Sequence, residues 1–422
     1  MTDPFTITTL GECRFDSTVE TTLFIKDDVR ILLDPRTAVG ESAGLVSPSL
    51  EMAGPRARTY FDPARTRVAV VTCGGLCPGL NDVIRSIVMV AWYRYGIRNI
   101  LGIRYGYEGL LSGGPRAPVP LTPEAVADIH QHGGTILGSS RGPQPVPAMV
   151  DFLLREGVDI LFTIGGDGTQ RGAMEIAEEL GRRSARVVVV GIPKTIDNDI
   201  AYTERTFGFN TAVAASQDAI GGAHMEAKGV FNGIGLVKLM GRESGFVAAH
   251  ASLASSDVNL VLLPEAPFSL EKVTAFLADR LRRKAHAVIV AAEGAGQNLV
   301  RVEGWDQSGN QRLGDIGVFL KNAFAEKLRS MGLSVSVKYI DPSYMIRSVP
   351  ANADDSVFCF QLAEHAVHAA LSGRTAMVVA LWNGHFVHVP IRHAVASRKQ
   401  VDVGGLLWQS VLDNTGQPKD LL

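Results

Sequence analysis

Seven short apolar runs recur along the chain, each followed by a glycine-rich or polar break and then by a stretch of helical character. Continuous apolar runs of this length, separated by helices, are typical of strands that are buried on both faces of a parallel sheet. The pattern therefore predicts a doubly wound α/β fold. The predicted strands are Arg67–Val71, Ile160–Ile164, Arg186–Val190, Leu236–Leu239, Leu260–Leu263, His286–Val290 and Met377–Leu381.

The first 65 residues differ from the rest of the chain because they show no strong helical period. Short apolar patches alternate there with turn-forming pairs such as Asp34-Pro35 and Gly54-Pro55. We interpret residues 1–65 as an N-terminal extension. The full length of 422 residues exceeds what one core usually holds, at about 150 residues a domain, so we expect two domains beyond the extension.

The composition is that of a soluble globular protein, with 46% hydrophobic and 20% charged residues. A net charge of -2 with scattered Lys and Arg predicts no basic face for nucleic acid or an anionic membrane. Asp3, Glu12 and Asp16 stand where a signal peptide would be basic and then apolar, and no stretch reaches the roughly 20 apolar residues of a membrane span. The four cysteines form no disulfide or zinc pattern. We therefore expect a cytoplasmic protein that binds neither nucleic acid nor membranes.

The segment Gly165–Thr169 reads Gly-Gly-Asp-Gly-Thr and lies between a predicted strand and a helix-forming stretch at Gln170–Leu180. Glycines let backbone amides approach a phosphate, and an aspartate among them suits a magnesium ion. A tight turn in which Asp167 only caps the helix is the open alternative. The segment predicts a phosphate site at the end of this strand.

The segment Pro193–Asp199 reads Pro-Lys-Thr-Ile-Asp-Asn-Asp and also follows a predicted strand. Its two carboxylates repel one another unless a cation or a proton-transfer role compensates. Phosphoryl transfer needs a base near the acceptor hydroxyl and cations for the phosphate oxygens, and Asp197 and Lys194 are of those types. A solvated charged loop is the alternative for this segment.

Three further segments combine glycine or arginine with small residues. Gly74–Asn81 would cradle a phosphate on backbone amides, although a glycine-rich turn after a strand is equally typical of ordinary structure. Gly138–Gly142 and Met240–Gly245 each hold an arginine between small residues, which lets a guanidinium reach a phosphate across bare backbone. For each arginine alone, an exposed surface position is the alternative.

In chain order, the motifs GGLCPGLN, GGDGT, PKTIDND and MGRESG resemble the 6-phosphofructokinase family, and PKTIDND is the most specific of them. The resemblance extends from Arg67 to about Asn383. It implies two Rossmann-like domains with parallel sheets and an active site in the cleft between them. The implied domains are 66–208 with 346–400 for the phosphoryl donor, and 209–345 with 401–422 for the sugar phosphate.

The resemblance also implies a reaction, which is phosphoryl transfer from ATP to the 1-hydroxyl of fructose 6-phosphate with Mg2+. Asp197 is then the base that takes the hydroxyl proton, with catalytic help from Asp199, Lys194 and Arg242. The implied donor-binding residues are Gly75, Tyr107, Arg141, Gly142, Gly166, Asp167, Gly168 and Thr169, with Asp167 serving the metal. The implied sugar-phosphate-binding residues are Thr195, Ile196, Asp197, Met240, Gly241, Arg242, Glu293, Lys338, Tyr344, Met345, Ile346 and Arg347.

Two positions bear on the identity of the donor. Members of the family that use pyrophosphate typically carry aspartate where this chain has Gly168 and lysine where it has Lys194. Glycine leaves room for the α-phosphate of ATP and removes a repulsive carboxylate, so we expect ATP. The mixed pair is similar to the ATP-dependent members of trypanosomatids and of related bacteria and plants. Pyrophosphate is the alternative donor.

The resemblance implies a homo-oligomer, a tetramer or a dimer, because Lys338 stands where an arginine from a neighbouring subunit is more usual. Gly-Gly-Asp-Gly-Thr also occurs in NAD kinases and lipid kinases, but PKTIDND and MGRESG argue against both. A non-catalytic sensor of sugar phosphates or nucleotides on the same fold is the alternative from another class. Such a sensor would not need the acid, base and cations that this chain retains.

Overall fold

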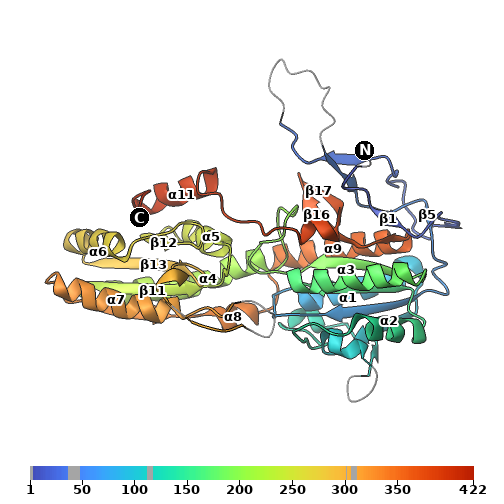
Figure 1. Ribbon diagram of the computed structural model, residues 1–422, viewed down its shortest axis with the longest axis horizontal. Helices are drawn as coiled ribbons and strands as arrows, with labels where there is room; N and C mark the ends of the chain where they lie inside the picture. Colours follow the sequence, from blue (N-terminus) through green and yellow to red (C-terminus); the bar gives the residue numbers. More distant parts are fainter. Residues whose placement is uncertain (1–2, 37–47, 112–116, 301, 306–310) are drawn as a thin grey trace. The chain divides into compact units, whose positions relative to one another are not determined.

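The computed structural model describes residues 3–36, 48–111, 117–300, 302–305 and 311–422. The chain forms two compact units (Figure 1). The first consists of Met1–Thr195, Ile200–Gly208 and Val349–Ser397, and the second of Ile196–Asp199, Phe209–Ser348 and Arg398–Leu422. This division differs from the predicted boundaries chiefly at Ile196–Asp199, because this short excursion makes its contacts with the second unit.

The first unit is built on a nine-stranded sheet in the order β3-β4-β17-β16-β10-β9-β6-β7-β8. The five strands from β16 to β7 are parallel, whereas β8, β17, β4 and β3 run antiparallel to their neighbours. The strands are β3 Arg30–Leu32, β4 Ser49–Met52, β17 His385–Pro390, β16 Met377–Trp382, β10 Val188–Pro193, β9 Ile160–Gly165, β6 Arg67–Thr72, β7 Asn99–Ile103 and β8 Val119–Pro120.

Helices cover both faces of this sheet. One face of the strands, including Ala69 and Leu161, packs on α2 and α3, and the alternate residues face the pair of helices α1 and α9. The α/β prediction is therefore confirmed for this unit. The helices are α1 Leu80–Tyr95, α2 Val146–Arg155, α3 Asp167–Arg182, α9 Ala353–Leu371 and α10 Ile391–Ala394, with 3-10 turns η1 Gly106–Leu110 and η2 Ile129–Gln131.

The N-terminal extension belongs to the first unit and adds strands to it. Strand β1, Thr8–Thr9, pairs with β15, Arg374–Thr375, and β2, Phe15–Asp16, pairs with β5, Arg58–Thr59. A buried ion cluster fastens the extension further, because the Glu51 carboxylate accepts from Arg56 at 3.0 Å and also from Arg374.

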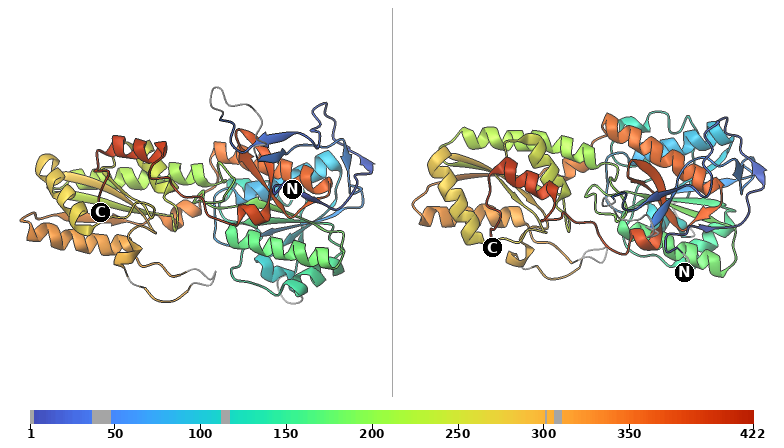
Figure 2. Two further views of the ribbon diagram at one scale, coloured as in Figure 1. Left: turned by 45° about the horizontal axis from the view of Figure 1, so that its top comes forward. Right: turned by 90° about the horizontal axis from the view of Figure 1, so that it is seen from above.

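The second unit is built on a four-stranded parallel sheet in the order β12-β13-β11-β14 (Figure 2). Helices α6 and α7 pack on one face around Phe324 and Leu277, while α4 and α5 pack together on the sheet. The strands are β11 Gly233–Leu239, β12 Leu260–Leu262, β13 His286–Ala292 and β14 Ser336–Ile340. The helices are α4 Phe209–Lys228, α5 Phe246–Ser255, α6 Leu270–Lys284, α7 Ile316–Ser330, α8 Ser343–Arg347 and α11 Leu406–Thr415, with the 3-10 turn η3 Gln297–Leu299.

The seven predicted strands correspond to β6, β9, β10, β11, β12, β13 and β16. The start of β10 was predicted two residues early, at Arg186, because pairing with β9 begins at Val188. Strands β7, β14 and β17 carry no continuous apolar run and were missed. Among the described residues, no helix has the length and apolar character needed to cross a membrane.

Candidate active site

In the first unit, the loop after β9 turns directly into helix α3, which begins at Asp167. Gly166 occupies the N-cap position and has no side chain with which to cap the first turn. A helix start without a side-chain cap offers backbone amides to an anion. At Gly168 an added Cβ would meet no atom within 4 Å, so space is open beside this turn. The turn is therefore suited to hold the phosphates of a donor.

Lys194 lies at the end of the neighbouring strand, β10, and its side chain is buried. Its ammonium donates a hydrogen bond to the carbonyl oxygen of Gly75 at 2.6 Å. Its backbone amide donates a hydrogen bond to the carbonyl oxygen of Gly165 at 2.9 Å. The lysine thus joins the two glycine-rich turns that follow β6 and β9, and it brings a positive charge to them.

The Asp167 carboxylate is held by Arg171, one turn further along α3, with a nitrogen-to-oxygen distance of 3.1 Å. The same guanidinium donates to the backbone carbonyl of Val395, just past α10, at 3.3 Å. The orientation of Asp167 therefore depends on a contact between α3 and α10.

The segment around Arg141 is fastened to the turn after β6. Ser139 Oγ donates to the Gly74 carbonyl at 2.6 Å, and the Gly74 amide donates to the Ser140 carbonyl at 3.0 Å. Arg141 follows at once and is exposed, and its guanidinium makes no ion pair within the described chain. Gly142, beside it, has a φ of 93°. The structure thus places Arg141 and Gly142 next to the same glycine-rich turn as Gly75.

Tyr107 lies beneath helix α3, where its side chain is buried. Its hydroxyl donates to the Thr169 carbonyl at 2.7 Å, in the first turn of α3. The Tyr107 side chain thus supports the first turn of α3, and its predicted contact with the donor stays a prediction. Tyr105 is the exposed aromatic of this loop and has a left-handed φ of 57°. It was not predicted, because nothing in the local sequence separates the two tyrosines.

In the second unit, the loops that follow β11 and β13 lie side by side. The Glu293 amide donates to Leu239 at 2.9 Å, and the Gly294 amide donates to Gly241 at 3.0 Å. Gly241 has a φ of 126°, and an added Cβ would come within 2.4 Å of the Ser244 carbonyl oxygen, so only glycine fits there. These bonds bring Met240, Gly241 and Arg242 next to Glu293.

Asp197 belongs to the second unit with its neighbour Asp199. Its backbone carbonyl accepts from Ser244 Oγ at 3.1 Å, which ties it to the loop after β11. Burial of the carboxyl, and then the charges of Asp199 and Glu293, raise the pKa of Asp197 well above the ordinary value of an aspartate. A carboxylate in such surroundings is a stronger proton acceptor than an exposed one.

The pKa of the Glu293 carboxyl is also raised, because the group is buried. Arg242 opposes this shift most strongly among the neighbouring charges. The Arg242 guanidinium donates to the Gln311 carbonyl at 2.6 Å. The carboxyls of Asp197 and Glu293 and the guanidinium of Arg242 therefore influence one another at this end of the second sheet.

Short helix α8 presents the predicted sugar-phosphate residues. Tyr344 and Met345 are exposed, and the Arg347 guanidinium lies 4.9 Å from the centre of the Tyr344 ring. The buried Nε of Arg347 has no hydrogen-bond partner within the described chain. Ile346 is 2% exposed, so its side chain anchors the helix, and its predicted contact with the sugar phosphate stays a prediction. Ile196 is likewise buried.

Lys238, on β11, is a residue that sequence reasoning missed. Its ammonium lies 2.8 Å from an Asp341 oxygen and 3.5 Å from an Asp315 oxygen. Burial is the largest single influence and lowers its pKa, but the hydrogen bond with Asp341 and the charges of its neighbours together outweigh burial, and the pKa is raised. The lysine therefore fixes the segment between β14 and α8. Its only sequence signal is a charge in an apolar strand.

The other predicted residues lie as follows. Lys338 is on the edge strand β14, half-exposed, with its ammonium 4.0 Å from Glu226. Thr195 is the last residue of the first unit before the excursion to Asp199, and its carbonyl accepts from Thr206 Oγ1 at 2.6 Å. No group of three or more His, Cys, Asp or Glu side chains suited to a metal ion occurs in the described part of the chain.

Comparisons with known proteins identify relatives of this chain. A family model described as Phosphofructokinase matches residues 67–370. An ATP-dependent 6-phosphofructokinase of Borreliella burgdorferi is 45% identical over 432 residues, which cover 98% of this chain and 97% of that protein. An ATP-dependent 6-phosphofructokinase of Amycolatopsis methanolica is 47% identical over 440 residues, which cover 99% of this chain and 96% of that protein. An ATP-dependent 6-phosphofructokinase of Trypanosoma cruzi is 48% identical over 393 residues, which cover 91% of this chain and 81% of that protein.

Solved structures resemble the fold. A pyrophosphate-dependent phosphofructokinase from Marinobacter aquaeolei aligns with a TM-score of 0.69 at 18% identity, over 84% of this chain and 93% of that chain. Pichia pastoris phosphofructokinase aligns with a TM-score of 0.65 at 23% identity, over 87% of this chain and 41% of that chain. At these identities the likeness concerns the fold alone.

Proposed function

This chain belongs to the phosphofructokinase family, and from that premise we propose that it transfers the γ-phosphoryl group of ATP to the 1-hydroxyl of fructose 6-phosphate. The products are fructose 1,6-bisphosphate and ADP. The observation that carries the proposal is the Asp197 carboxyl, whose pKa is raised by burial and by Asp199 and Glu293. A proton acceptor of this kind is what attack by a sugar hydroxyl requires.

In the proposed reaction, the hydroxyl proton of the sugar passes to Asp197 as the sugar oxygen forms a bond to the γ-phosphorus. The bond between that phosphorus and the bridging oxygen of ATP breaks, and the electron pair leaves with ADP. Asp199 and Glu293 keep Asp197 basic through their negative charge. Each group acts from the second unit, so this unit carries the acceptor half of the reaction.

The first unit supplies the donor half in this proposal. The uncapped first turn of α3 and the turn after β6 bind phosphate oxygens through backbone amides. Lys194, buried beside Gly75, neutralises negative charge that builds on the transferring group. Arg242 of the second unit acts on the same group, and Arg347 binds the 6-phosphate with its unsatisfied Nε.

The residues fit a magnesium ion that arrives with ATP. Mg2+ is usually held by one or two carboxylates together with substrate phosphates and water. Asp167 is the carboxylate at the start of α3, and its side chain is 23% exposed. We propose that Asp167 holds this ion, which when bound would offset the negative charge of the phosphates.

The proposed donor is ATP because of Gly168. Among the described residues, no neighbouring atom lies within 4 Å of an added Cβ at this position, and this open space supports a place for the α-phosphate. Lys194 is compatible with either donor, since its charge acts on the transferring phosphoryl group. Pyrophosphate remains the second candidate donor, supported by the lysine.

We further propose a cytoplasmic homo-oligomer, a tetramer or a dimer. Lys338 supports this, because it is half-exposed on the edge strand of the second sheet. Equilibrium sedimentation of the purified chain tests it, and a fully active monomer at nanomolar concentration would contradict it.

A direct assay tests the reaction and the donor together. Production of fructose 1,6-bisphosphate is measured with ATP and with pyrophosphate, each with Mg2+, at equal concentrations of fructose 6-phosphate. We expect kcat/KM to be at least a hundredfold higher with ATP. The reverse preference would overturn the donor assignment, and binding of both substrates without turnover would identify a sensor.

A further inference from the structure

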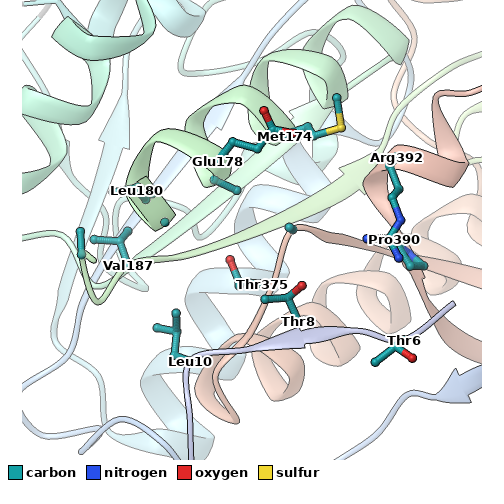
Figure 3. A pocket seen from close by; sticks show the side chains of 14 residues that line it. Thr6, Thr8, Leu10, Met174, Glu178, Leu180, Val187, Thr375, Pro390 and Arg392 are labelled. Atoms are coloured by element: carbon teal, nitrogen blue, oxygen red, sulfur yellow. The ribbon is translucent and has the colours of Figure 1, made fainter. Parts of the chain in front are cut away.

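A cavity of about 300 Å³ lies in the first unit, away from the glycine-rich turns (Figure 3). The second half of α3 forms one wall, with residues spaced i, i+3, i+4 and i+7 so that they share one face of the helix. The N-terminal extension forms the opposite wall. The lining residues are Thr6, Thr8, Leu10, Met174, Ala177, Glu178, Leu180, Gly181, Ala185, Val187, Thr375, Ala376, Pro390 and Arg392.

The wall from the extension follows the two-residue period of a strand. Phe5 and Ile7 are buried on the protein side, whereas Thr6, Thr8 and Leu10 line the cavity. The pairing of Thr8 with Thr375 of β15 holds this segment in register. The extension therefore completes a cavity that the rest of the unit would leave open.

The lining has one cation and one anion in a mainly apolar surface. Arg392 donates to the Pro4 carbonyl at 2.6 Å, and within the described chain no carboxylate lies at ion-pairing distance from its guanidinium. Glu178 likewise makes no ion pair there. Leu10, Met174 and Val187 supply apolar contact. An arginine that lacks a carboxylate partner, next to an apolar wall, suits a compound with a flat apolar body and an anionic group.

Contacts through α10 and Arg171 connect the cavity to the first turn of α3, the turn that carries Asp167. Arg392 is on α10, and the Val395 carbonyl at the end of α10 accepts from Arg171. Arg171 in turn holds Asp167 at 3.1 Å. An anion that draws Arg392 toward the cavity would therefore shift α10, and through α10 it would act on Arg171, which orients Asp167.

We propose that this cavity is an effector site for a small organic anion, a carboxylate or a phosphate ester with an aromatic body. When the anion is bound, the affinity of the first turn of α3 for the nucleotide changes. The site goes beyond the reaction proposed above, because none of its residues takes part in phosphoryl transfer. Coupling of two sites through a shared element typically changes affinity by about 5- to 150-fold.

Calorimetric titration of the full chain with 2-naphthoate tests binding, with saturating fructose 6-phosphate and ADP present to occupy the active site. Inorganic phosphate lacks the apolar body and 2-naphthol lacks the charge, so both should bind at least tenfold more weakly than 2-naphthoate. Arg392→Gln should weaken 2-naphthoate at least tenfold, since a charge-assisted hydrogen bond is lost. Arg182→Gln, at an exposed arginine at the end of α3 that does not line the cavity, is the matched control.

Thr8→Trp gives an independent test, because Thr8 is exposed on the extension and a large side chain there would fill the cavity. It should abolish binding of 2-naphthoate without lowering the melting temperature. If 2-naphthoate binds no better than the two control compounds, or if both Arg392→Gln and Thr8→Trp bind it normally, the site does not exist.

Coupling is measured as the Kd of ADP with and without 2-naphthoate, which does not depend on turnover. We expect a change of about fivefold or more in the wild-type chain and a smaller change in Arg171→Gln, in which the contact between α10 and Asp167 is broken. Binding of 2-naphthoate with an unchanged Kd for ADP would overturn the coupling. This outcome would leave the phosphofructokinase reaction itself untouched.

Discussion

The candidate site residues of the two units differ in the kind of chemical group that they offer. In the first unit, backbone amides at glycine-rich turns dominate, and one buried lysine, Lys194, serves them. In the second unit, charged side chains crowd together, and the pKa values of Asp197 and Glu293 are raised by burial. Under the proposed function, the first unit would bind a phosphate chain through the geometry of its backbone, whereas the second would tune a proton acceptor through charged neighbours.

This difference predicts how each unit fails. A substitution in the first unit acts by adding bulk or charge where open space is needed. A substitution in the second unit acts by removing one member of a balanced set of charges.

The largest effect is expected at Gly168. A carboxylate placed about 4 Å from a phosphate oxygen costs on the order of 4 kcal/mol at an effective dielectric near 20, which is roughly a thousandfold. Gly168→Asp should therefore lower kcat/KM for ATP about a thousandfold. Because an added Cβ meets nothing within 4 Å, the variant should fold normally. Steady-state kinetics with ATP and a melting curve measure both.

Gly168→Asn is the matched control, since it adds the same shape without the charge. It should retain most of the activity with ATP. Equal losses in the two variants would mean that bulk, and not charge, selects the donor. If Gly168→Asp still used ATP well, the donor assignment would be wrong.

A loss of at least about 100-fold in kcat is expected for Asp197→Asn, because a positioned base is removed. The KM for fructose 6-phosphate should change little. In the wild type, kcat/KM should fall as the pH falls through the Asp197 pKa, because protonation abolishes the base. Since this pKa is raised, the fall should begin at a higher pH than an ordinary aspartate would give.

The pH profile of Asp197→Asn should lack this acid limb, and that separates a base from a residue that only shapes the loop. Asp199→Asn is the comparison, because it removes a neighbouring charge that raises the Asp197 pKa. Its acid limb should move to lower pH. Near-normal turnover of Asp197→Asn would remove this residue from the mechanism.

Much of the first unit's part of the site could be predicted from sequence, because its residues are local. Gly166, Asp167, Gly168 and Thr169 follow one strand, and one strand end supplies Lys194. Glycines that meet a helix start identify the loop without knowledge of any distant contact. Strands β6, β9, β10 and β16 were predictable for the same reason, since each carries a continuous apolar run.

Contacts between distant segments could not be predicted in this way. Arg171 gains its role from the Val395 carbonyl, 224 residues further along the chain. Lys238 gains its role from Asp341, which follows another strand. Tyr107 is buried whereas Tyr105 is exposed, and the local sequence does not distinguish the two. Strands β3, β4 and β17 were missed because they are short or alternate polar with apolar residues, as antiparallel strands can, and so carry no continuous apolar run.

Lys238→Met should raise the KM for fructose 6-phosphate about tenfold and change kcat less. The substitution leaves Asp341 and Asp315 without their cation, so the segment that leads to α8 and Arg347 loosens. Lys327→Met is the control, because Lys327 makes an exposed pair with Glu271 at 2.8 Å. An unchanged KM in Lys238→Met would show that α8 is held by other contacts.

The smallest effect is expected for Tyr107→Phe, which removes only the hydroxyl beneath α3. The lost hydrogen bond to the Thr169 carbonyl is worth about 1 kcal/mol, or about 2–4 °C in melting temperature for a unit of this size. The KM for ATP should rise by a few fold, because the first turn of α3 is less well supported. Tyr105→Phe, at the exposed tyrosine, should leave the melting temperature unchanged. If Tyr105→Phe raised the KM for ATP and Tyr107→Phe did not, the exposed ring would be the one that contacts the donor.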